Sequence, residues 1–292
     1  MDNRPVGVDH YENFPVASWW CPPALRPAVL AIYRFARTAD DIADEGDAPA
    51  GERRASLARF SSALQACAGG EPGAEWSDVF RPLALQMRVH ALPVTPFEQL
   101  LSAFVQDTAN PLYADRAELL DYCSRSANPI GLLLLHLARV RDPQALRESD
   151  AVCTALQLIN FWQDLSRDLP RGRCYVTRAD AERHGLPLPP PAVDSPGARA
   201  LVRELVAWTR SMMLDGAPLV HRLPGRFGWE LRFVIQGGLR VLDKIEAVGC
   251  DAMTYRPTVR AVDAPWLAWR ALRMRPRHPG DADPQSRDEA LR

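Results

Sequence analysis

YRFARTADDIAD, residues 33–44, and LQLINFWQDLSRD, residues 156–168, are the two segments that decide the fold of this chain. In each segment polar side chains recur at steps of three and four residues, so they share one face of an α-helix over about three turns. The sequence therefore predicts two helices, each with a polar stripe that ends in carboxylates. The first stripe is Tyr33, Arg37, Asp40 and Asp44, and the second is Gln157, Asn160, Asp164 and Asp168.

The carboxylates of these stripes need compensating positive charge. Asp40 and Asp44 lie one helical turn apart, and like-charged pairs at this spacing destabilise a helix by roughly 0.2–0.5 kcal/mol each. Arg37 supplies only part of the compensation. Oxygen ligands without cysteine or histidine suit a hard cation, and Mg²⁺ typically binds one or two carboxylates together with phosphate oxygens and water. The stripes therefore predict a site for a Mg²⁺-bound polyphosphate.

The composition argues against several other classes of function. The chain has 292 residues and a formal net charge of −1, which gives no electrostatic reason to bind nucleic acid. Its six cysteines are scattered, form no Cys-x-x-Cys pair and follow no signal peptide, so we expect reduced thiols in a cytoplasmic protein. No apolar run approaches the roughly 18 residues of a membrane-spanning helix.

Apolar residues recur with helical spacing along most of the chain, and no segment alternates as a strand does, so the predicted class is all-α. Pro129 should break or kink a helix near the middle. Residues 171–196 should be irregular and end in a proline-rich surface loop. The tail 274–292 has the composition of disorder. Helices are expected at about 24–45, 52–68, 76–91, 96–107, 148–169, 198–223 and 229–247.

The two acidic segments, the second followed by GRCYV at residues 172–176, resemble the two aspartate-rich motifs of the head-to-head isoprenyl diphosphate synthases. This family contains the squalene, phytoene and dehydrosqualene synthases, and the resemblance covers most of residues 10–260. It implies a single-domain, isoprenoid-synthase-type helical bundle over residues 1–273 around a deep central cavity. The two motifs would face each other at its mouth, the substrate would be a prenyl diphosphate, and the cofactor would be Mg²⁺.

The resemblance also implies roles by position. The expected Mg²⁺ ligands are Asp40, Asp44, Asn160, Asp164 and Asp168, of which the four aspartates are the expected catalytic residues. The expected diphosphate ligands are Tyr33, Arg37, Gln157 and Arg173. The expected substrate-cavity residues are His10, Asn13, Phe14, Tyr122 and Phe161, and the segment from His10 to Phe14 would cover one diphosphate as a flap.

Simpler structural roles stay open for some of these residues. Arg37 has a helical neighbour at the i+4 position in Asp41, with which it can pair. Arg173 can anchor the loop that follows the second motif. Phe161 and Trp162 have the spacing of core residues and are more typical of a packed interior than of a wall that stabilises a cation.

Several segments look like the hydroxysqualene synthases of bacterial hopanoid biosynthesis. They are HYENFPVAS at 10–18, FARTADDIADEG at 35–46, SANPIG at 126–131 and WLAWRALR at 266–273. Such an enzyme converts presqualene diphosphate and water to hydroxysqualene and diphosphate by ionisation, rearrangement and water quenching. Departure of the diphosphate needs positive charge from metal ions and arginine, and the cation needs apolar and aromatic walls.

Other functions stay open at this stage. A condensing synthase would join two farnesyl diphosphates into presqualene diphosphate, squalene, dehydrosqualene or phytoene. A squalene synthase would also use NADPH, and a non-enzymatic helical scaffold would only expose its acidic faces to water. Gln163 stands where relatives often carry an arginine, and Arg125 and Gly238 stand where some carry a tyrosine. The smaller number of diphosphate contacts favours a substrate with one diphosphate.

The expected partners follow from the chemistry of such a product. A long hydrocarbon cannot diffuse far in water, so we expect peripheral contact with the inner face of a membrane. Coupling to other enzymes of the hopanoid pathway is a further expectation. The sequence does not locate the surface through which the hydrocarbon would pass.

Overall fold

The computed structural model describes residues 22–44 and 48–275, and in these ranges it contains α-helices and short 3₁₀ turns but no strand. The predicted all-α class is confirmed. Each helix in these ranges falls short of the length or the apolarity that crossing a membrane requires. The predicted flap residues His10, Asn13 and Phe14, and most of the predicted tail, lie outside the described residues. The helices are α1 (Arg26–Asp44), α2 (Ala50–Ala68), α3 (Ser77–His90), α4 (Thr95–Asp107), α5 (Arg116–Ser126), α6 (Asn128–Leu137), α7 (Pro143–Asp168), α8 (Arg178–Arg183), α9 (Pro196–Gly216), α10 (Gly225–Ala247) and α11 (Ala264–Arg273).

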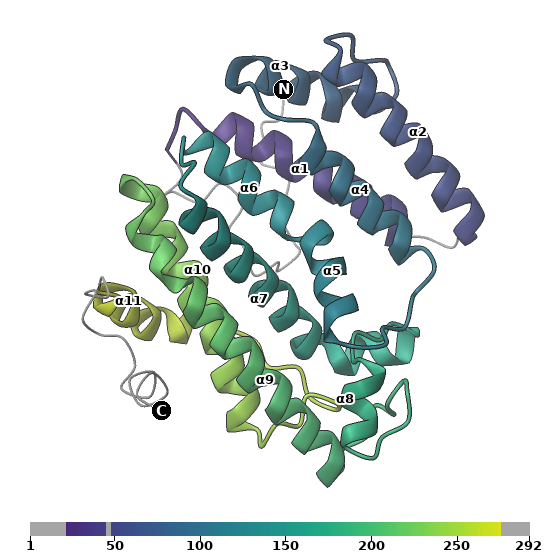
Figure 1. The fold of residues 1–292 in the computed structure, drawn as a ribbon, viewed down its shortest axis with the longest axis vertical. Helices are drawn as coiled ribbons and strands as arrows, with labels where there is room; N and C mark the ends of the chain where they lie inside the picture. Colours follow the sequence, from purple (N-terminus) through teal and green to yellow (C-terminus); the bar gives the residue numbers. More distant parts are fainter. Residues whose placement is uncertain (1–21, 45–47, 276–292) are drawn as a thin grey trace, which may run out of the picture.

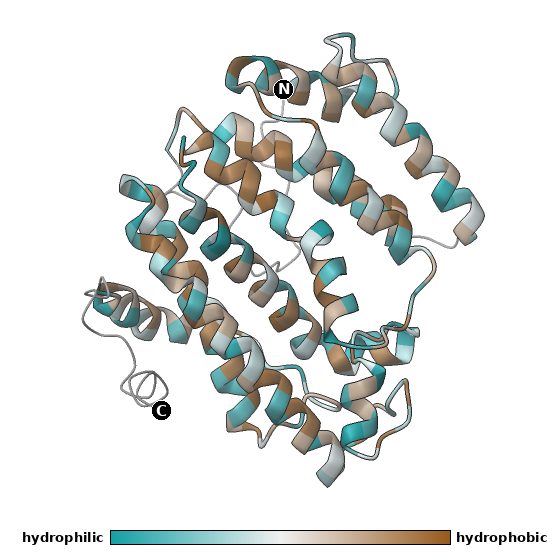
Figure 2. Ribbon diagram, in the orientation of Figure 1, coloured by the Kyte–Doolittle hydropathy of each residue, from teal (hydrophilic) through white to brown (hydrophobic). Residues whose placement is uncertain are grey.

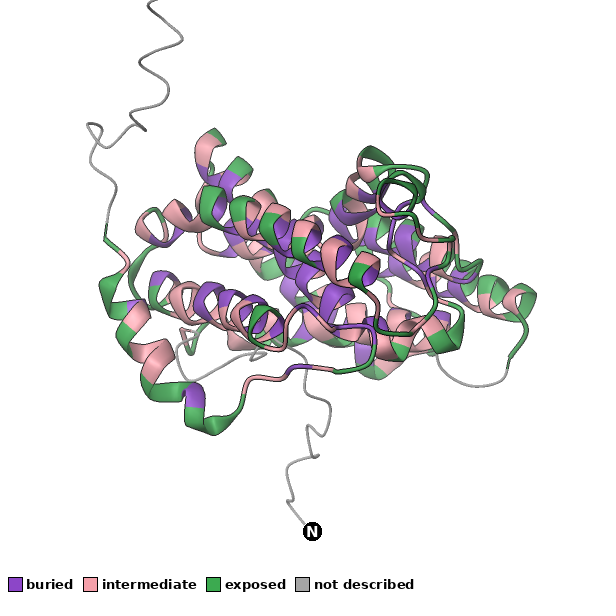
Figure 3. Ribbon diagram, turned by 90° about the horizontal axis from the view of Figure 1, so that it is seen from below, coloured by how far each residue is buried: buried purple, intermediate pink, exposed green. Residues whose placement is uncertain are grey.

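The helices form two groups with separate cores (Figure 1). Helices α1 to α4 enclose a core around Phe35, whose ring centroid lies 5.2 Å from that of Phe60 and 5.0 Å from that of Phe97. Helices α5, α7, α9 and α10 enclose the second core, in which Trp162 is fully buried and donates a hydrogen bond to Thr209 Oγ1 at 2.8 Å. Apolar residues gather on the faces where helices meet, and polar residues lie outside (Figures 2 and 3).

The first polar stripe is positioned by the packing of α1. The buried face of this helix is mostly alanine, with Ile32 and Phe35, so neighbouring helices approach it closely. The stripe occupies the adjoining face. At the end of α1, Arg53 of α2 donates a hydrogen bond from Nη1 to the carbonyl oxygen of Ala43 at 2.8 Å. This bond satisfies one of the carbonyl groups that a helix end leaves unpaired.

The second polar stripe lies on α7, which begins at Pro143 and not near residue 148 as predicted. The earlier start has a local cause. The Asp142 carboxylate accepts hydrogen bonds from the backbone N–H groups of Gln144 and Ala145 at 3.3 and 3.2 Å, and proline fits the first turn of a helix. The helix then continues without interruption to Asp168, so it carries the whole stripe.

The break predicted at Pro129 is confirmed, because α5 ends at Ser126 and α6 begins at Asn128. After this break, Gly131 brings α6 against α7. A Cβ atom at this position would lie 2.5 Å from Ser149 Oγ and 2.6 Å from the Sγ atom of Cys153, both on α7. Glycine is therefore required for this close approach.

Residues 171–196 contain the helix α8 where an irregular segment is predicted. Thr177 caps this helix, since its Oγ1 accepts a hydrogen bond from the backbone N–H of Asp180 at 3.1 Å. The Asp180 side chain turns inward and is 1% exposed. Long-range partners, which spacing along the chain does not reveal, therefore hold this short helix in place.

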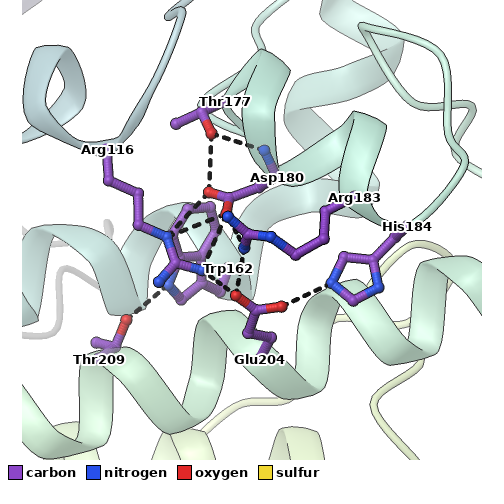
Figure 4. A network of polar contacts seen from close by, with 8 residues as sticks. All are labelled: Arg116, Trp162, Thr177, Asp180, Arg183, His184, Glu204 and Thr209. Carbon is purple, nitrogen blue, oxygen red and sulfur yellow. Dashed lines mark hydrogen bonds and ion pairs between the residues drawn. The ribbon is translucent and has the colours of Figure 1, made fainter.

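Asp180 is the centre of a polar network that joins three helices (Figure 4). Arg116 of α5 donates hydrogen bonds from Nε to both carboxylate oxygens at 3.1 Å, and Arg183 Nη1 lies 3.0 Å from Oδ1. Glu204 of α9 pairs with Arg116 at 2.7 Å and with His184 at 2.8 Å. The network ties the segment after the second acidic motif to the body of the molecule.

Replacement of Asp180 by alanine should lower the free energy of unfolding by about 3 kcal/mol, because it removes the buried carboxylate on which Arg116, Arg183 and Thr177 converge. The measurement is urea unfolding followed by circular dichroism. Asp194→Ala is the matched control, since Asp194 pairs with Arg199 at 2.6 Å on the surface, where ion pairs contribute little. Equal losses in the two variants would contradict a stabilising role for the network.

Candidate active site

A cavity of about 340 Å³ lies between the two groups of helices, with walls from α1, α6, α7 and α10. Its lining changes in character along α1. Val29 and Ile32 come first, and Arg37 and Asp40 follow toward the end of the helix. Gln157 of the second stripe lines the same cavity from α7, and most of the remaining wall is aliphatic. Polar groups of both predicted stripes therefore open onto one apolar space.

An ion pair joins the regions of the two acidic motifs. Arg173, in the segment after α7, places Nη1 2.8 Å from Asp44 Oδ2 at the end of α1. Burial raises the pKa of the Asp44 carboxyl, and the charge of Arg173 opposes this shift. Burial and the neighbouring Asp164 carboxylate raise the pKa of Asp168 to about 6, with Asp44 adding to the shift. The end of α1 and the end of α7 therefore share one electrostatic environment, with Arg173 between them.

Arg173 thus has the anchoring role that the sequence left open. Arg37 has two roles. Its Nη2 lies 2.7 Å from Asp41 Oδ1, which is the ion pair along the helix that the sequence offered as the simpler role. Its Nη1 lies 3.3 Å from Asp40 Oδ2. Arg37 also lines the cavity, so its guanidinium is in reach of a ligand there.

Asp164 has a partner that helical spacing does not predict. Arg256, in the segment between α10 and α11, donates hydrogen bonds from Nε to Asp164 Oδ1 and, at 3.3 Å, from Nη2 to Oδ2. The two residues are 92 positions apart in the sequence. No local signal marks Arg256, and only the packing of the chain brings it to the second acidic motif.

A fifth carboxylate, Asp107, belongs to the same environment and is not predicted from the sequence. It ends α4, and its Oδ2 accepts a hydrogen bond from the Tyr122 hydroxyl at 2.9 Å. Burial raises the pKa of Asp107 to about 7, and the charges of Asp44 and Asp40 add to the shift. Its only sequence signal is its place at the end of a predicted amphipathic helix.

Tyr122 and Phe161, predicted to line the substrate cavity, are not among the residues that line the 340 Å³ space, and the Tyr122 hydroxyl is hydrogen-bonded to Asp107. The Phe161 ring stacks on Tyr175, with centroids 3.6 Å apart and planes 5° apart, and lies 6.2 Å from Tyr122. All three side chains are largely buried. Phe35 belongs to the first core and Trp162 to the second, so Trp162 is a packing residue, as its spacing in the sequence indicated.

Each of the three residues that depart from the family pattern has a structural contact within the protein. Gln163 is buried and donates a hydrogen bond from Nε2 to the carbonyl oxygen of Pro257 at 2.6 Å. A Cβ atom on Gly238 would lie 3.0 Å from Ile159 Cδ1, so this glycine sits where α10 approaches α7. Arg125 pairs with Asp121 at 2.9 Å near the surface.

The arrangement of the acidic residues suits a metal ion that also binds a diphosphate better than it suits a metal ion bound only by protein side chains. In the described part of the chain, no three Asp, Glu, His or Cys side chains lie close enough to hold a metal ion together. The predicted donors are oxygen ligands on two helices, Asp40 and Asp44 on α1 and Asn160, Asp164 and Asp168 on α7. Mg²⁺ suits this arrangement because it takes few carboxylates and fills its coordination with phosphate oxygens and water.

The raised pKa of Asp107 has a measurable consequence for stability. The folded protein holds a proton on this carboxyl up to pH about 7, whereas the unfolded chain loses it near pH 4, so this group costs stability as pH rises through that window. Asp107→Asn keeps an acceptor for Tyr122 and removes the charge. Its melting temperature relative to the wild type should therefore be higher at pH 8 than at pH 5, in thermal scans without magnesium.

Asp121→Asn is the control for this measurement, because Asp121 is exposed and lies outside the carboxylate group. A difference between Asp107→Asn and wild type that does not change with pH would show that the Asp107 carboxyl titrates normally.

Comparisons with known proteins agree with this geometry. The chain is 38% identical over 159 residues to the hydroxysqualene synthase of Zymomonas mobilis, an alignment that covers 54% of this chain and about half, 51%, of that protein. It is 35% identical over 207 residues to the presqualene diphosphate synthase of the same organism, covering 70% and 69% of the two chains. The crystal structure of squalene synthase HpnC from Alicyclobacillus acidocaldarius superposes with a TM-score of 0.75 at 34% identity, covering 82% of this chain and 90% of that one.

The predicted isoprenoid-synthase-type helical fold is confirmed by this superposition. The sequence profile of the family described as squalene/phytoene synthase matches residues 8–270, which is most of the chain. The match includes both acidic stripes, the segment that carries Arg173 and the helices around the cavity. The chain belongs to the squalene/phytoene synthase family.

Proposed function

We propose that this protein is a hydroxysqualene synthase, which converts presqualene diphosphate and water to hydroxysqualene and diphosphate with the help of Mg²⁺. The observation that carries the proposal is a largely apolar cavity whose lining includes Arg37, Asp40 and Gln157 of the two polar stripes. This shape and polarity suit a long hydrocarbon with a single charged head. The similarity to the hydroxysqualene synthase of Zymomonas mobilis supports the same reaction.

The residues at the polar end would hold the diphosphate and its ion. Asp40, Asp44, Asn160, Asp164 and Asp168 would hold Mg²⁺, which supplies positive charge against the oxygens of the leaving group when it is bound. Toward the same diphosphate, Arg37 and Arg173 add fixed positive charge, and Tyr33 and Gln157 add hydrogen bonds. Preorganised positive charge of this kind lowers the barrier to heterolysis because it stabilises the negative charge that develops on the departing diphosphate.

The reaction then needs little further chemistry from side chains. The bond between the cyclopropylcarbinyl carbon and the diphosphate oxygen breaks, and its electron pair leaves with the diphosphate. The carbon cation rearranges within the cavity, where aliphatic residues such as Leu134, Leu156 and Leu231 exclude bulk water. One water molecule adds its oxygen to the rearranged cation. The proton that it loses can pass to the diphosphate, the base nearest to the site.

The second candidate is a condensing synthase that joins two farnesyl diphosphates. The 35% identity to a presqualene diphosphate synthase favours it. Such an enzyme must bind two diphosphates in its first step. Relatives carry diphosphate-contacting side chains at the positions of Gly238 and Gln163. Here Gly238 lies where α10 approaches α7, and the Gln163 side chain bonds to the Pro257 carbonyl oxygen. The loss of these two diphosphate contacts supports a substrate with a single diphosphate.

Product analysis separates these two reactions. Purified protein with Mg²⁺ and no NADPH should form hydroxysqualene from presqualene diphosphate and no product from farnesyl diphosphate, as followed by gas chromatography and mass spectrometry. Presqualene diphosphate or a hydrocarbon from farnesyl diphosphate would instead identify a condensing synthase and would refute the proposed reaction.

Asp40→Asn and Asp164→Asn test the role of the two motifs. Each should reduce turnover of presqualene diphosphate by about 10²-fold or more, because each removes a charge that holds the ion against the leaving group. Both variants should still unfold cooperatively. In the wild type, Mg²⁺ with inorganic pyrophosphate at about 100 times its Kd should stabilise the fold by about 2.7 kcal/mol, and the variants should lose most of this gain.

Asp194→Asn is the matched control for these measurements, because Asp194 belongs to an exposed ion pair in the loop before α9. It should leave both turnover and the stabilisation by pyrophosphate unchanged. Turnover at the wild-type rate in Asp40→Asn or Asp164→Asn would refute the metal assignment.

A further inference from the structure

The last described helix, α11, lies on the outside of the bundle against α10 (Figures 1 and 3). Ala271 is its only buried residue. Large apolar side chains on and just before it face water, with Trp269 at 52%, Leu272 at 67% and Val262 at 82% exposure. Apolar side chains of this size gathered on one short element mark an interaction surface more often than scattered exposed residues do.

Most apolar residues of α11 fall on two faces, and Trp266 lies between them, with the guanidinium groups of Arg240 and Arg270 4.7 and 4.8 Å from its ring centroid. Leu267, Ala271 and Met274 are spaced by four and three residues, and the fully buried Ala271 marks this face as the one that packs toward α10. Pro265, Trp269 and Leu272 have the same spacing, are all exposed, and fall on the opposite side of the helix. We call this second set the outer face. Packing against α10 explains the first face and leaves the outer face unexplained.

The charges around the outer face are all of one sign. From Ala264 to Arg275 the chain carries Arg270, Arg273 and Arg275 and no acidic residue. The guanidinium of Arg273 lies 4.4 Å from the ring centroid of Trp269. The nearest acidic residue along the chain, Asp263, is 3% exposed and its charge is neutralised by Lys244 at 2.7 Å. Within residues 264–275 the surface therefore combines exposed apolar side chains with three arginines and no acidic residue.

We propose that the outer face of α11 docks on an anionic lipid membrane. Tryptophan and arginine suit the boundary between headgroups and acyl chains, where an apolar ring or stem lies inside and a polar group stays outside. A short helix with an apolar face and basic flanks lies in the plane of such a boundary and is attracted to negative headgroups.

The size of the surface argues against a second copy of the chain as its partner. A ten-residue helix is about 15 Å long and about 10 Å wide, so one face offers far less than the roughly 800 Å² that each partner of a stable protein interface buries. A bilayer needs no matching partner surface. A few apolar side chains and basic groups are enough for reversible attachment.

The position of α11 also connects the membrane with the cavity. Arg232 of α10 donates hydrogen bonds from Nη1 to the carbonyl oxygens of Ala271, at 3.0 Å, and of Met274, which fastens α11 to α10. On the same stretch of α10, Phe227 and Leu231 line the apolar cavity. If the product is the long-chain isoprenoid alcohol of the proposed function, docking at α11 places the wall of the cavity beside a membrane in which this product dissolves.

Vesicle flotation tests docking without reference to the reaction. The full-length protein should float with vesicles of phosphatidylethanolamine and phosphatidylglycerol, and less with vesicles of phosphatidylcholine alone. The double variant Trp269→Ser/Leu272→Ser should bind the anionic vesicles at least about tenfold more weakly, because it removes the side chains that enter the membrane. Arg270→Gln/Arg273→Gln should lose most of the preference for anionic lipid and of the sensitivity to salt.

The matched control is Leu85→Ser/Val89→Ser on α3. These side chains are 47% and 62% exposed, lie one turn apart, and belong to the other end of the molecule (Figure 1). The control should float like the wild type, and circular dichroism should show the same helical content for all variants, since none of the changed side chains belongs to a buried core.

Two results would overturn this proposal. One is a wild type that does not float with anionic vesicles, or a Trp269→Ser/Leu272→Ser variant that floats equally well. The other is a wild-type dimer that this variant converts to a monomer without any lipid binding, which would assign the outer face to a second copy. Neither result depends on the reaction, so docking and the proposed function fail independently.

Discussion

The burial of carboxylates that the fold gathers from three helices is the constraint on which the rest of the site depends. Asp44, Asp107 and Asp168 come from α1, α4 and α7, and burial raises the pKa of each. Arg173 offsets part of this cost by its ion pair with Asp44, and a bound cation would offset more. The unfavourable charge in the protein alone therefore favours the binding of a cation.

Such a cluster persists only if rigid packing holds the helices that carry it. The aromatic core around Phe35 fixes α1, and the core that contains Trp162 fixes α7. The network around Asp180 holds the segment after α7, which includes Arg173. Because the two cores are separate, an apolar space is left between them, and the polar stripes open onto it. Cavity and charge cluster are thus two consequences of one packing arrangement.

Several features follow from local chemistry and are predicted correctly. The break at Pro129 and the two stripes depend on the geometry of a few neighbouring residues, and the structure contains both. The helix α8 is not predicted, because its six residues lie in a proline-rich context and are held by Arg116 from another helix. Tyr122 and Phe161 are predicted to line the substrate cavity, but only packing shows that Tyr122 bonds to Asp107 and that Phe161 stacks on Tyr175.

The sequence by itself determined the helical class, the stripe on each of two helices and, through its resemblance to a family, the kind of ligand. These features are local, since a step of three or four residues places side chains on one helix face whatever the rest of the chain does. Only the tertiary structure decided that Arg256 neutralises Asp164, that Asp107 joins the carboxylates and that Trp269 faces water. Each of these depends on how distant helices pack, and contacts between distant residues leave no periodic signal in a single sequence.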